Sequence, residues 1–301
     1  SIDVANIMAL KNIIMEQSIG NELVNREKYE EELKKRFDIR MLSDYSSSLY
    51  FAEFDLPFLK KFDTKIIVNT FGSTVEDYVE ACRFLNKLDI DGVEINLSCP
   101  NVKAGCMAFG NTYEGVKEVT EKCRRVIDKP LIVKLTPNVT DITQTAKAVE
   151  DAGADGVSLI NTLMGMKIDI DKRRPVLANN TGGLSGPAIK PVAVRMVYQV
   201  AQKVKIPILG LGGIVSGDDA IEFMLAGATA ISIGSGNFID PYVATKTVKG
   251  IEDYCIVFKL DNTYFNPKNK YYNHIDEDIN YINTHPYKNA HPYGKYIKDC
   301  D

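Results

Sequence analysis

Histidine is scarce in this chain, and its central part has none. The 301 residues include three histidines, and all of them lie within the last 28 residues, at His274, His285 and His291. Ser-His-Asp and Cys-His nucleophile systems, and catalytic metal sites with histidine ligands, all need an imidazole beside the reacting group. None of these arrangements can therefore be built on residues 65–255.

Several other features are missing as well. The formal net charge of -4 leaves no basic surface for nucleic acid. No apolar run reaches the roughly 18 residues of a membrane span, and residue 1 does not open a signal-peptide pattern, so we expect a cytoplasmic protein that does not enter the membrane. The cysteines lack CxxC spacing, which argues against a disulfide framework or a structural zinc site; they are Cys82, Cys99, Cys106, Cys123, Cys255 and Cys300.

The central part alternates short apolar runs with amphipathic helical segments. The helical segments cover residues 75–88, 113–127, 142–152 and 218–226, and the apolar runs cover residues 66–68, 93–95, 131–133, 156–160, 208–211 and 230–233. Such alternation predicts a parallel sheet wound by right-handed βαβ units. A (β/α)8 TIM barrel needs two further strands, which residues 1–64 would have to supply.

The stretch 93–101, Val-Glu-Ile-Asn-Leu-Ser-Cys-Pro-Asn, is the richest in site chemistry. It starts as a buried strand and ends at a Cys-Pro pair that turns the chain into a loop. Asn96, Ser98, Cys99 and Asn101 offer two amides, a hydroxyl and a thiol, a set suited to a planar, amide-bearing small molecule. A single Cys or Asn at a strand end is more often a packing or capping residue, but four polar groups within six positions favour a site.

Glycines follow the last two predicted strands, as Gly212-Gly213 and Gly234-Ser235. They would let backbone N–H groups approach a phosphate closely, as the corresponding loops of TIM barrels do. The alternative is that each pair only turns the chain.

Lys134 closes the third strand and should point into the mouth of the barrel. There it needs an anionic partner, which a bound flavin would supply on reduction. An ion pair with a carboxylate is the alternative.

Five ordered motifs together resemble those of the catalytic subunit of class 1B dihydroorotate dehydrogenase, over about residues 55–255. They are NLSCPNVK (96–103), VKLTPN (133–138), LINTL (159–163), NTGGLSGPAIKP (180–191) and ILGLGGI (208–214). The resemblance implies a (β/α)8 TIM barrel that binds FMN. It also implies flavin-dependent oxidation of dihydroorotate to orotate in de novo pyrimidine biosynthesis.

The resemblance also implies roles for individual residues. Cys99 would be the base that takes the C5 proton while a hydride leaves C6 for the flavin. Asn96 would contact both FMN and substrate, and Asn101, Asn161 and Thr162 would hold the pyrimidine. The positions that match FMN-binding residues of the family are Asn69, Asn96, Lys134, Ile160, Gly186, Gly212, Gly213, Gly234 and Ser235. No metal is implied.

A partner subunit follows from the same resemblance. In this family type the electrons pass to NAD through a second subunit that carries FAD and an iron-sulfur cluster. The sequence has neither the clustered cysteines of such a cluster nor a GxGxxG motif opening a Rossmann unit. Use of NAD would therefore require a partner chain, and the resemblance implies a homodimer, or a heterotetramer with the electron-transfer subunit.

Both ends depart from the family pattern. Residues 1–54 form an atypical segment without the lysine and the Gly-Leu-x-Asn loop that the family has there, so the first two βα units are expected to be atypical or incomplete. Residues 256–301 form a Tyr-, Asn- and Lys-rich extension with seven of the fifteen tyrosines. Two alternatives stay open: a related flavin oxidoreductase acting on other dihydropyrimidines, and a degenerate, non-catalytic flavin-binding barrel.

Overall fold

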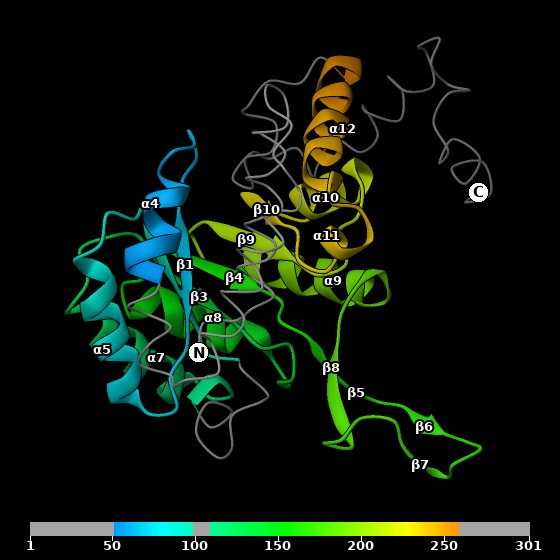
Figure 1. Ribbon diagram of the computed structural model, residues 1–301, viewed down its shortest axis with the longest axis horizontal. Coiled ribbons are helices and arrows are strands. Elements are labelled where there is room, and N and C mark those ends of the chain that lie inside the picture. The colour runs from blue at the N-terminus through cyan, green and yellow to red at the C-terminus, as the bar shows by residue number, and fades with distance from the viewer. Residues whose placement is uncertain (1–50, 99–108, 259–301) are drawn as a thin grey trace.

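A single parallel sheet forms the centre of the computed structural model, which describes residues 51–98 and 109–258 (Figure 1). The strand order is β1-β2-β3-β4-β9-β10, and every neighbouring pair is parallel. The strands are β1 (Ile67–Thr70), β2 (Gly92–Asn96), β3 (Leu131–Lys134), β4 (Gly156–Leu159), β9 (Ile208–Leu211) and β10 (Ala230–Ser232). The six apolar runs of the sequence are thus confirmed as strands.

Helices connect the strands and cover one face of the sheet. They are α5 (Val75–Asn86), α7 (Tyr113–Arg124), α8 (Ile142–Asp151), α9 (Lys190–Ala201), α10 (Gly217–Leu225), the short α11 (Gly236–Ile239) and α12 (Val243–Phe258). Their starts are specified locally, because the side chains of Thr74, Thr112, Asp141 and Ser216 each accept a backbone N–H of the first turn. Thr74 and Asp77 complete a capping box.

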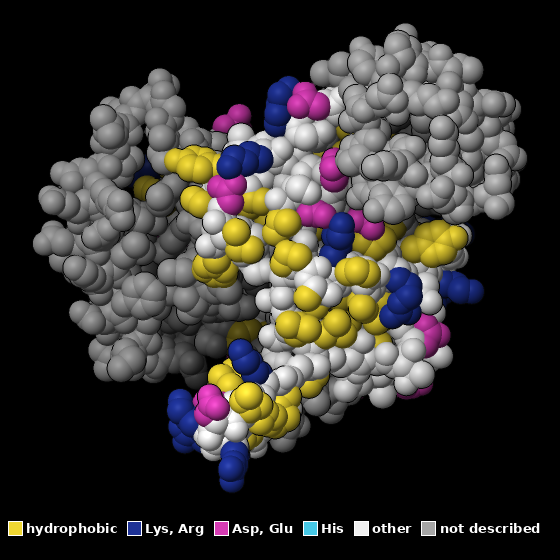
Figure 2. Space-filling view, turned by 90° about the vertical axis from the view of Figure 1, so that its right-hand side faces the viewer, with side chains coloured by type: hydrophobic (Ala, Val, Ile, Leu, Met, Phe, Trp, Pro, Cys, Tyr) yellow, Lys and Arg dark blue, Asp and Glu magenta, His cyan; other side chains and the backbone are white. Residues whose placement is uncertain are grey.

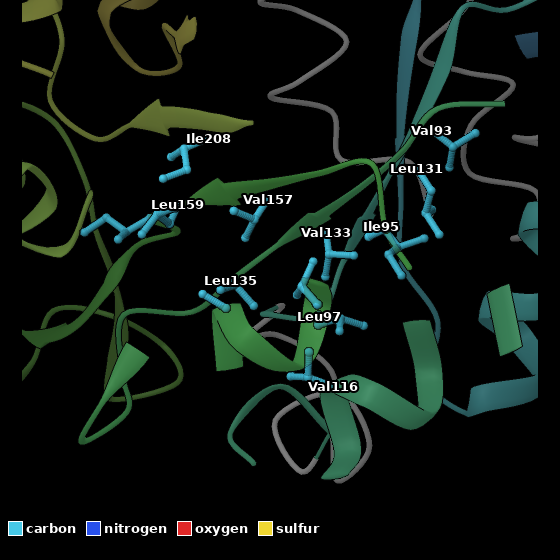
Figure 3. Close-up of a cluster of buried hydrophobic side chains, with 14 of the residues drawn as sticks. Val93, Ile95, Leu97, Val116, Leu131, Val133, Leu135, Val157, Leu159 and Ile208 are labelled. Carbon is cyan, nitrogen blue, oxygen red and sulfur yellow. The ribbon is translucent and has the colours of Figure 1, made fainter. Parts of the chain in front are cut away.

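The main hydrophobic core lies between the sheet and these helices. Val93, Ile95 and Leu97 point to the same side and pack with Val116 of α7 and with alternate residues of β3 and β4 (Figure 3). Since side chains alternate across a strand, Glu94 and Asn96 must face the opposite side. The polar residues of the strands therefore share the face that the helices do not cover.

Residues 51–64 contain no strand. They form a π-helix, η2 (Phe51–Asp55), followed by the single-turn helix α4 (Leu56–Leu59). The described chain therefore builds six of the eight strands of a TIM barrel, as an incompletely closed sheet. Two closing strands would have to lie in residues 1–50, outside the described residues, as does most of the predicted C-terminal extension (259–301).

An arm of antiparallel strands projects from the body after β4 (Figure 1). In it β5 (Leu163–Met166) pairs with β8 (Thr181–Leu184), and β6 (Ile168–Asp169) pairs with β7 (Arg174–Pro175). Figure 2 shows hydrophobic side chains beside Lys and Arg on the arm; the exposed ones are Met164, Met166, Ile168, Ile170, Val176, Leu177 and Leu184. A turn of 3-10 helix, η3 (Pro187–Ile189), returns the chain to α9.

Two of the cysteines belong to the core. Cys82 of α5 and Cys123 of α7 are both fully buried. The hydrogen bond between the two thiols, and then burial, raise the pKa of Cys123 far above its ordinary value. The Cys123 thiol therefore stays protonated and unreactive. Within the described residues, no helix is long and apolar enough to cross a membrane, and no cluster of His, Cys, Asp and Glu could hold a metal ion.

Candidate active site

The carboxyl ends of β2, β3 and β4 carry a hydrogen-bonded polar cluster. Asn96 ends β2 and is only 4% exposed. Its Oδ1 accepts from Ser98 N at 3.1 Å, from Ser98 Oγ at 2.7 Å and from Asn161 Nδ2 at 3.2 Å. Asn161 Nδ2 also donates to Ser98 Oγ at 2.5 Å, and Asn161 Oδ1 accepts from Thr162 N at 2.7 Å. The structure thus brings together Asn96, Asn161 and Thr162, three of the predicted substrate-binding residues.

Asn138 holds the loop that carries Asn161 and Thr162. Its Nδ2 donates to Thr162 O at 3.0 Å, and its Oδ1 accepts from Met164 N at 2.9 Å. Thr136 Oγ1 accepts from Asn138 N at 3.2 Å, which fixes the asparagine itself. Sequence reasoning assigned Asn138 no role. The sequence feature that could have indicated its role is the Pro137-Asn138 pair just beyond a strand. Asparagine at such a position often forms local hydrogen bonds from its side chain to the backbone.

Lys134 is buried in the mouth of the sheet and lacks an ion-pair partner among the described residues. It ends β3, is 8% exposed and lies in register between Asn96 of β2 and Ser158 of β4. No carboxylate of the described residues lies within 4.0 Å of its ammonium group, so the structure does not support the alternative of a plain ion pair. A buried ammonium group without a partner is costly, which favours an anionic ligand beside it.

Asn69 of β1 is a buried residue of the same face with an unmet hydrogen bond. Its Nδ2 donates to Glu94 Oε2 of β2, whereas its Oδ1 is fully buried and has no partner. Buried polar atoms in proteins are nearly always paired, and leaving one unpaired costs about 1–3 kcal/mol. The carbonyl of Asn69 therefore has an unmet hydrogen bond that the donor of a ligand would satisfy.

Three glycine-containing loops meet at the same carboxyl edge, beside β9 and β10; two follow β9 and β10, and the third follows β8 of the arm. Gly213 has φ = 83°, and a Cβ there would lie 2.7 Å from the carbonyl oxygen of Gly186. A Cβ on Gly186, whose φ is 86°, would lie 3.9 Å from Ser235 Oγ. Both positions require glycine, because positive φ strains any other side chain. The loops thus approach one another through bare backbone, as a phosphate cradle requires.

Neighbouring residues keep these loops in place. A Cβ on Gly212 would come within 3.4 Å of Ile160, which puts these two predicted FMN-binding residues side by side. Asn237 Nδ2 donates to Ile233 O at 2.9 Å and to Gly234 O at 3.1 Å, which fixes the turn after β10. The predicted cofactor residues on four segments therefore converge, although the sequence separates them widely.

An ion cluster fastens α9 to α10 beneath the glycine loops. Lys190 Nζ lies 2.7 Å from Asp219 Oδ1 and 2.6 Å from Glu222 Oε2. Asp219 Oδ2 also accepts from Val215 N at 3.0 Å, in the loop that follows Gly212 and Gly213. Burial raises the pKa of Asp219 most, but the hydrogen bonds from Lys190, Val215 and Ser216 together outweigh it and lower the pKa below its ordinary value.

Asp219→Asn is expected to lower the free energy of unfolding by about 2 kcal/mol at neutral pH, because a charged hydrogen bond is lost. A depressed pKa stabilises the fold above the unfolded value of about 3.9, and this contribution disappears as the pH falls through the folded value. Urea denaturation at pH 7 and pH 3 should therefore show a larger difference between wild type and variant at pH 7 than at pH 3. An equal difference at both pH values would contradict the ion-pair account.

Two predicted site residues cannot be placed. Cys99, the predicted base, and Asn101, a predicted substrate ligand, lie in the loop 99–108, outside the described residues. Cys99 directly follows Ser98, whose hydroxyl belongs to the polar cluster. The described part of the site therefore leads directly into the loop that carries the thiol.

Known proteins resemble the chain in sequence and in fold. The family model described as dihydroorotate dehydrogenase matches residues 2–255. The protein named dihydroorotate dehydrogenase B (NAD(+)), catalytic subunit, from Alkaliphilus metalliredigens is 57% identical over 204 residues, which are 68% of this chain and 68% of that protein. Proteins of the same name from Porphyromonas gingivalis and Parabacteroides distasonis are 57% and 59% identical, each over 68% of this chain and over 67% and 68% of their own lengths.

A solved structure supports the fold. The crystal structure of DHODH from Eimeria tenella in complex with ferulenol superposes with a TM-score of 0.54 at 21% identity. The superposition covers 62% of this chain and 56% of that one, so the chain spans little more than half of that structure. The family model, the curated relatives and this structure agree with the resemblance first seen in the motifs. The chain belongs to the dihydroorotate dehydrogenase family.

Proposed function

We propose that the chain is the catalytic subunit of a class 1B dihydroorotate dehydrogenase, which oxidises dihydroorotate to orotate in de novo pyrimidine biosynthesis with FMN as the hydride acceptor. The names of its relatives support the reaction. The observation that carries the proposal is the amide and hydroxyl cluster of Asn96, Ser98 and Asn161 beside the buried Lys134, which has no ion-pair partner within residues 51–98 and 109–258. A dihydropyrimidine ring and a flavin would satisfy these groups together.

The described residues fit FMN in three separate ways. Gly186, Gly212 and Gly213 lack side chains, so their backbone N–H groups could approach the phosphate of FMN closely. Gly234 and Ser235 lie beside them. The unpaired carbonyl of Asn69 suits a donor of the cofactor, and Lys134 suits negative charge on the reduced ring. When bound, FMN supplies the hydride acceptor of the reaction.

The substrate would be held by carboxamides. A dihydropyrimidine ring presents alternating N–H and C=O groups along its edge, and asparagine side chains can pair with both. Asn96, Asn161 and Thr162 already stand together, and Asn101 would join them from the neighbouring loop. Because each amide in the cluster also bonds to another side chain, the cluster is held in position before the ring arrives.

Cys99 would act as the base. Its thiolate would take the proton from C5 of dihydroorotate, and the electron pair of that C–H bond would form the C5–C6 double bond while a hydride is lost from C6; bound FMN would supply the acceptor for that hydride. No histidine lies between residues 65 and 255, so the barrel body offers the thiol no imidazole. This matches a reaction in which one proton is removed and no acyl intermediate is formed.

The electrons would then pass to NAD through a partner. The relatives' names include both NAD(+) and "catalytic subunit", which supports an association with a second chain. We propose that the second chain is an FAD- and iron-sulfur-containing subunit, and that the protein works in the cytoplasm as a homodimer or as a heterotetramer with that subunit.

Steady-state turnover with an artificial electron acceptor tests this proposal. The FMN-loaded chain is expected to form orotate from dihydroorotate without NAD, and to leave dihydrouracil, which lacks the carboxylate, largely unreacted. Faster oxidation of dihydrouracil would favour the related dihydropyrimidine oxidoreductase. Bound FMN without turnover of either compound would favour the degenerate, non-catalytic barrel.

A further inference from the structure

Glu94 is a buried carboxylate that the proposed chemistry does not use. It lies on β2, is 9% exposed and precedes Asn96 by two residues, so both side chains face the side of the sheet that carries the site. In register it stands opposite Asn69 of β1 and Ile132 of β3. Glu94 thus lies one layer below Asn96 and Lys134.

Among the described residues, the carboxylate of Glu94 accepts hydrogen bonds only from uncharged side chains. Asn69 Nδ2 donates to Glu94 Oε2, and Ser158 Oγ donates to Glu94 Oε1 at 2.5 Å. No lysine or arginine of residues 51–98 or 109–258 lies within 4.0 Å of Glu94. Burying a charge with neutral partners is costly, and an apolar side chain here would pack at less cost. Stability alone therefore does not account for a carboxylate at this position.

The chemistry of the pair dictates which way Asn69 faces. A carboxylate only accepts hydrogen bonds, whereas an asparagine amide offers donors on one side and an acceptor on the other. Glu94 therefore holds the NH₂ group of Asn69 and leaves its carbonyl as the free group. That carbonyl oxygen is one of three buried side-chain atoms without a hydrogen-bond partner among the described residues, with Asn237 Oδ1 and Thr247 Oγ1.

We propose that Glu94 is a positioning residue, which fixes the Asn69 amide with its oxygen toward the cofactor so that Asn69 can accept a hydrogen bond from FMN. This inference rests on the proposed function, because it takes FMN as the ligand. Glu94 touches neither cofactor nor substrate, and its effect passes through Asn69.

Glu94→Gln tests the proposal with little change in size. Glutamine can bind the Asn69 amide in either orientation, so the preference for an outward carbonyl is lost. The dissociation constant of FMN, measured by quenching of flavin fluorescence, is expected to rise about tenfold, since one well-formed hydrogen bond is worth about 1 kcal/mol or somewhat more. Glu94→Asp keeps the carboxylate but shortens the side chain by one methylene group, so it no longer reaches the Asn69 amide. A similar loss of FMN affinity is expected.

A double-mutant cycle separates positioning from a general effect on the fold. In the Asn69→Ala background, Glu94→Gln is expected to change FMN affinity less than about twofold, because the group that Glu94 orients is gone. Asp91→Asn is the matched control. Asp91 accepts from Ile66 N and Lys65 Nζ, both at 2.9 Å, at the opposite end of the same strand pair, and its loss should lower thermal stability but not FMN affinity.

Three outcomes would overturn the inference. The first is an equal loss of affinity from Glu94→Gln with and without Asn69, because the effect would then not pass through Asn69. The second is that the wild type binds FMN and that both Glu94→Gln and Glu94→Asp bind it with the same affinity. This result would overturn the inference but leave the proposed function intact. The third is a wild-type chain that binds no FMN, which overturns the proposed function and the inference together.

Discussion

Cys99→Ala is expected to slow the reduction of the bound flavin by dihydroorotate about 10²-fold or more, because no other group replaces the base. Its FMN content should equal that of the wild type, since the residues that fit FMN lie elsewhere. Anaerobic stopped-flow absorbance measures the rate directly. A variant that reduces its flavin at the wild-type rate would remove Cys99 from the mechanism.

The pH profile gives an independent reading of the same thiol. A free thiol has a pKa of about 8.5, so only a few per cent is thiolate at neutral pH and the fraction rises with pH. The reduction rate of the wild type should therefore climb between about pH 6 and pH 9. Cys106→Ala is the matched control from the same loop, and it should keep both the rate and the profile. A flat profile for the wild type would contradict a thiolate base.

Lys134→Met is expected to have the second largest effect. It removes the buried cation that we place beside the reduced flavin, and the loss of one such charge typically costs about 10²-fold or more in rate. The variant should bind FMN more weakly, and the reduction potential of its flavin should fall, because the anionic reduced ring loses its counter-charge. Potentiometric titration of the bound flavin measures this shift.

Lys65→Met is the control for Lys134→Met. Lys65 precedes β1 at the opposite end of the sheet, where its exposed ammonium group bonds to Asp91. Removing this charge should leave both the reduction potential and the flavin reduction rate unchanged. An equal drop in potential in both variants would show that net charge matters rather than position. A Lys134→Met variant with an unchanged potential would place Lys134 away from the flavin.

The strands and their polar ends could be predicted from sequence because each is specified locally. An apolar run such as 131–133 predicts a buried strand, and the first polar residue beyond it, Lys134, lies at the carboxyl end of that strand. In a parallel sheet all such ends lie on one edge. For this reason Asn96, Lys134 and Asn161 could be expected to meet, and the structure confirms that Asn96 and Asn161 do.

Residues whose role depends on register could not be predicted. We assign Glu94 a role because it is paired in register with Asn69 and accepts a hydrogen bond from Ser158. The sequence around Glu94 does not predict either of these long-range contacts. Asn138 likewise acts on Thr162, a residue on the next strand's loop. The arm from β5 to β8 was missed because its short strands mix glycines with exposed apolar residues and lack clean alternation. Cys99 and Asn101 stay predictions, since their loop lies outside the described residues.

The visible absorption spectrum of the purified chain, taken before and after anaerobic addition of dihydroorotate, tests the central claim most directly. We expect a flavin band that bleaches when dihydroorotate is added, with orotate formed in an amount equal to the flavin reduced. A chain that shows no flavin band even after reconstitution with FMN, or a band that dihydroorotate leaves unchanged, would contradict the proposed function.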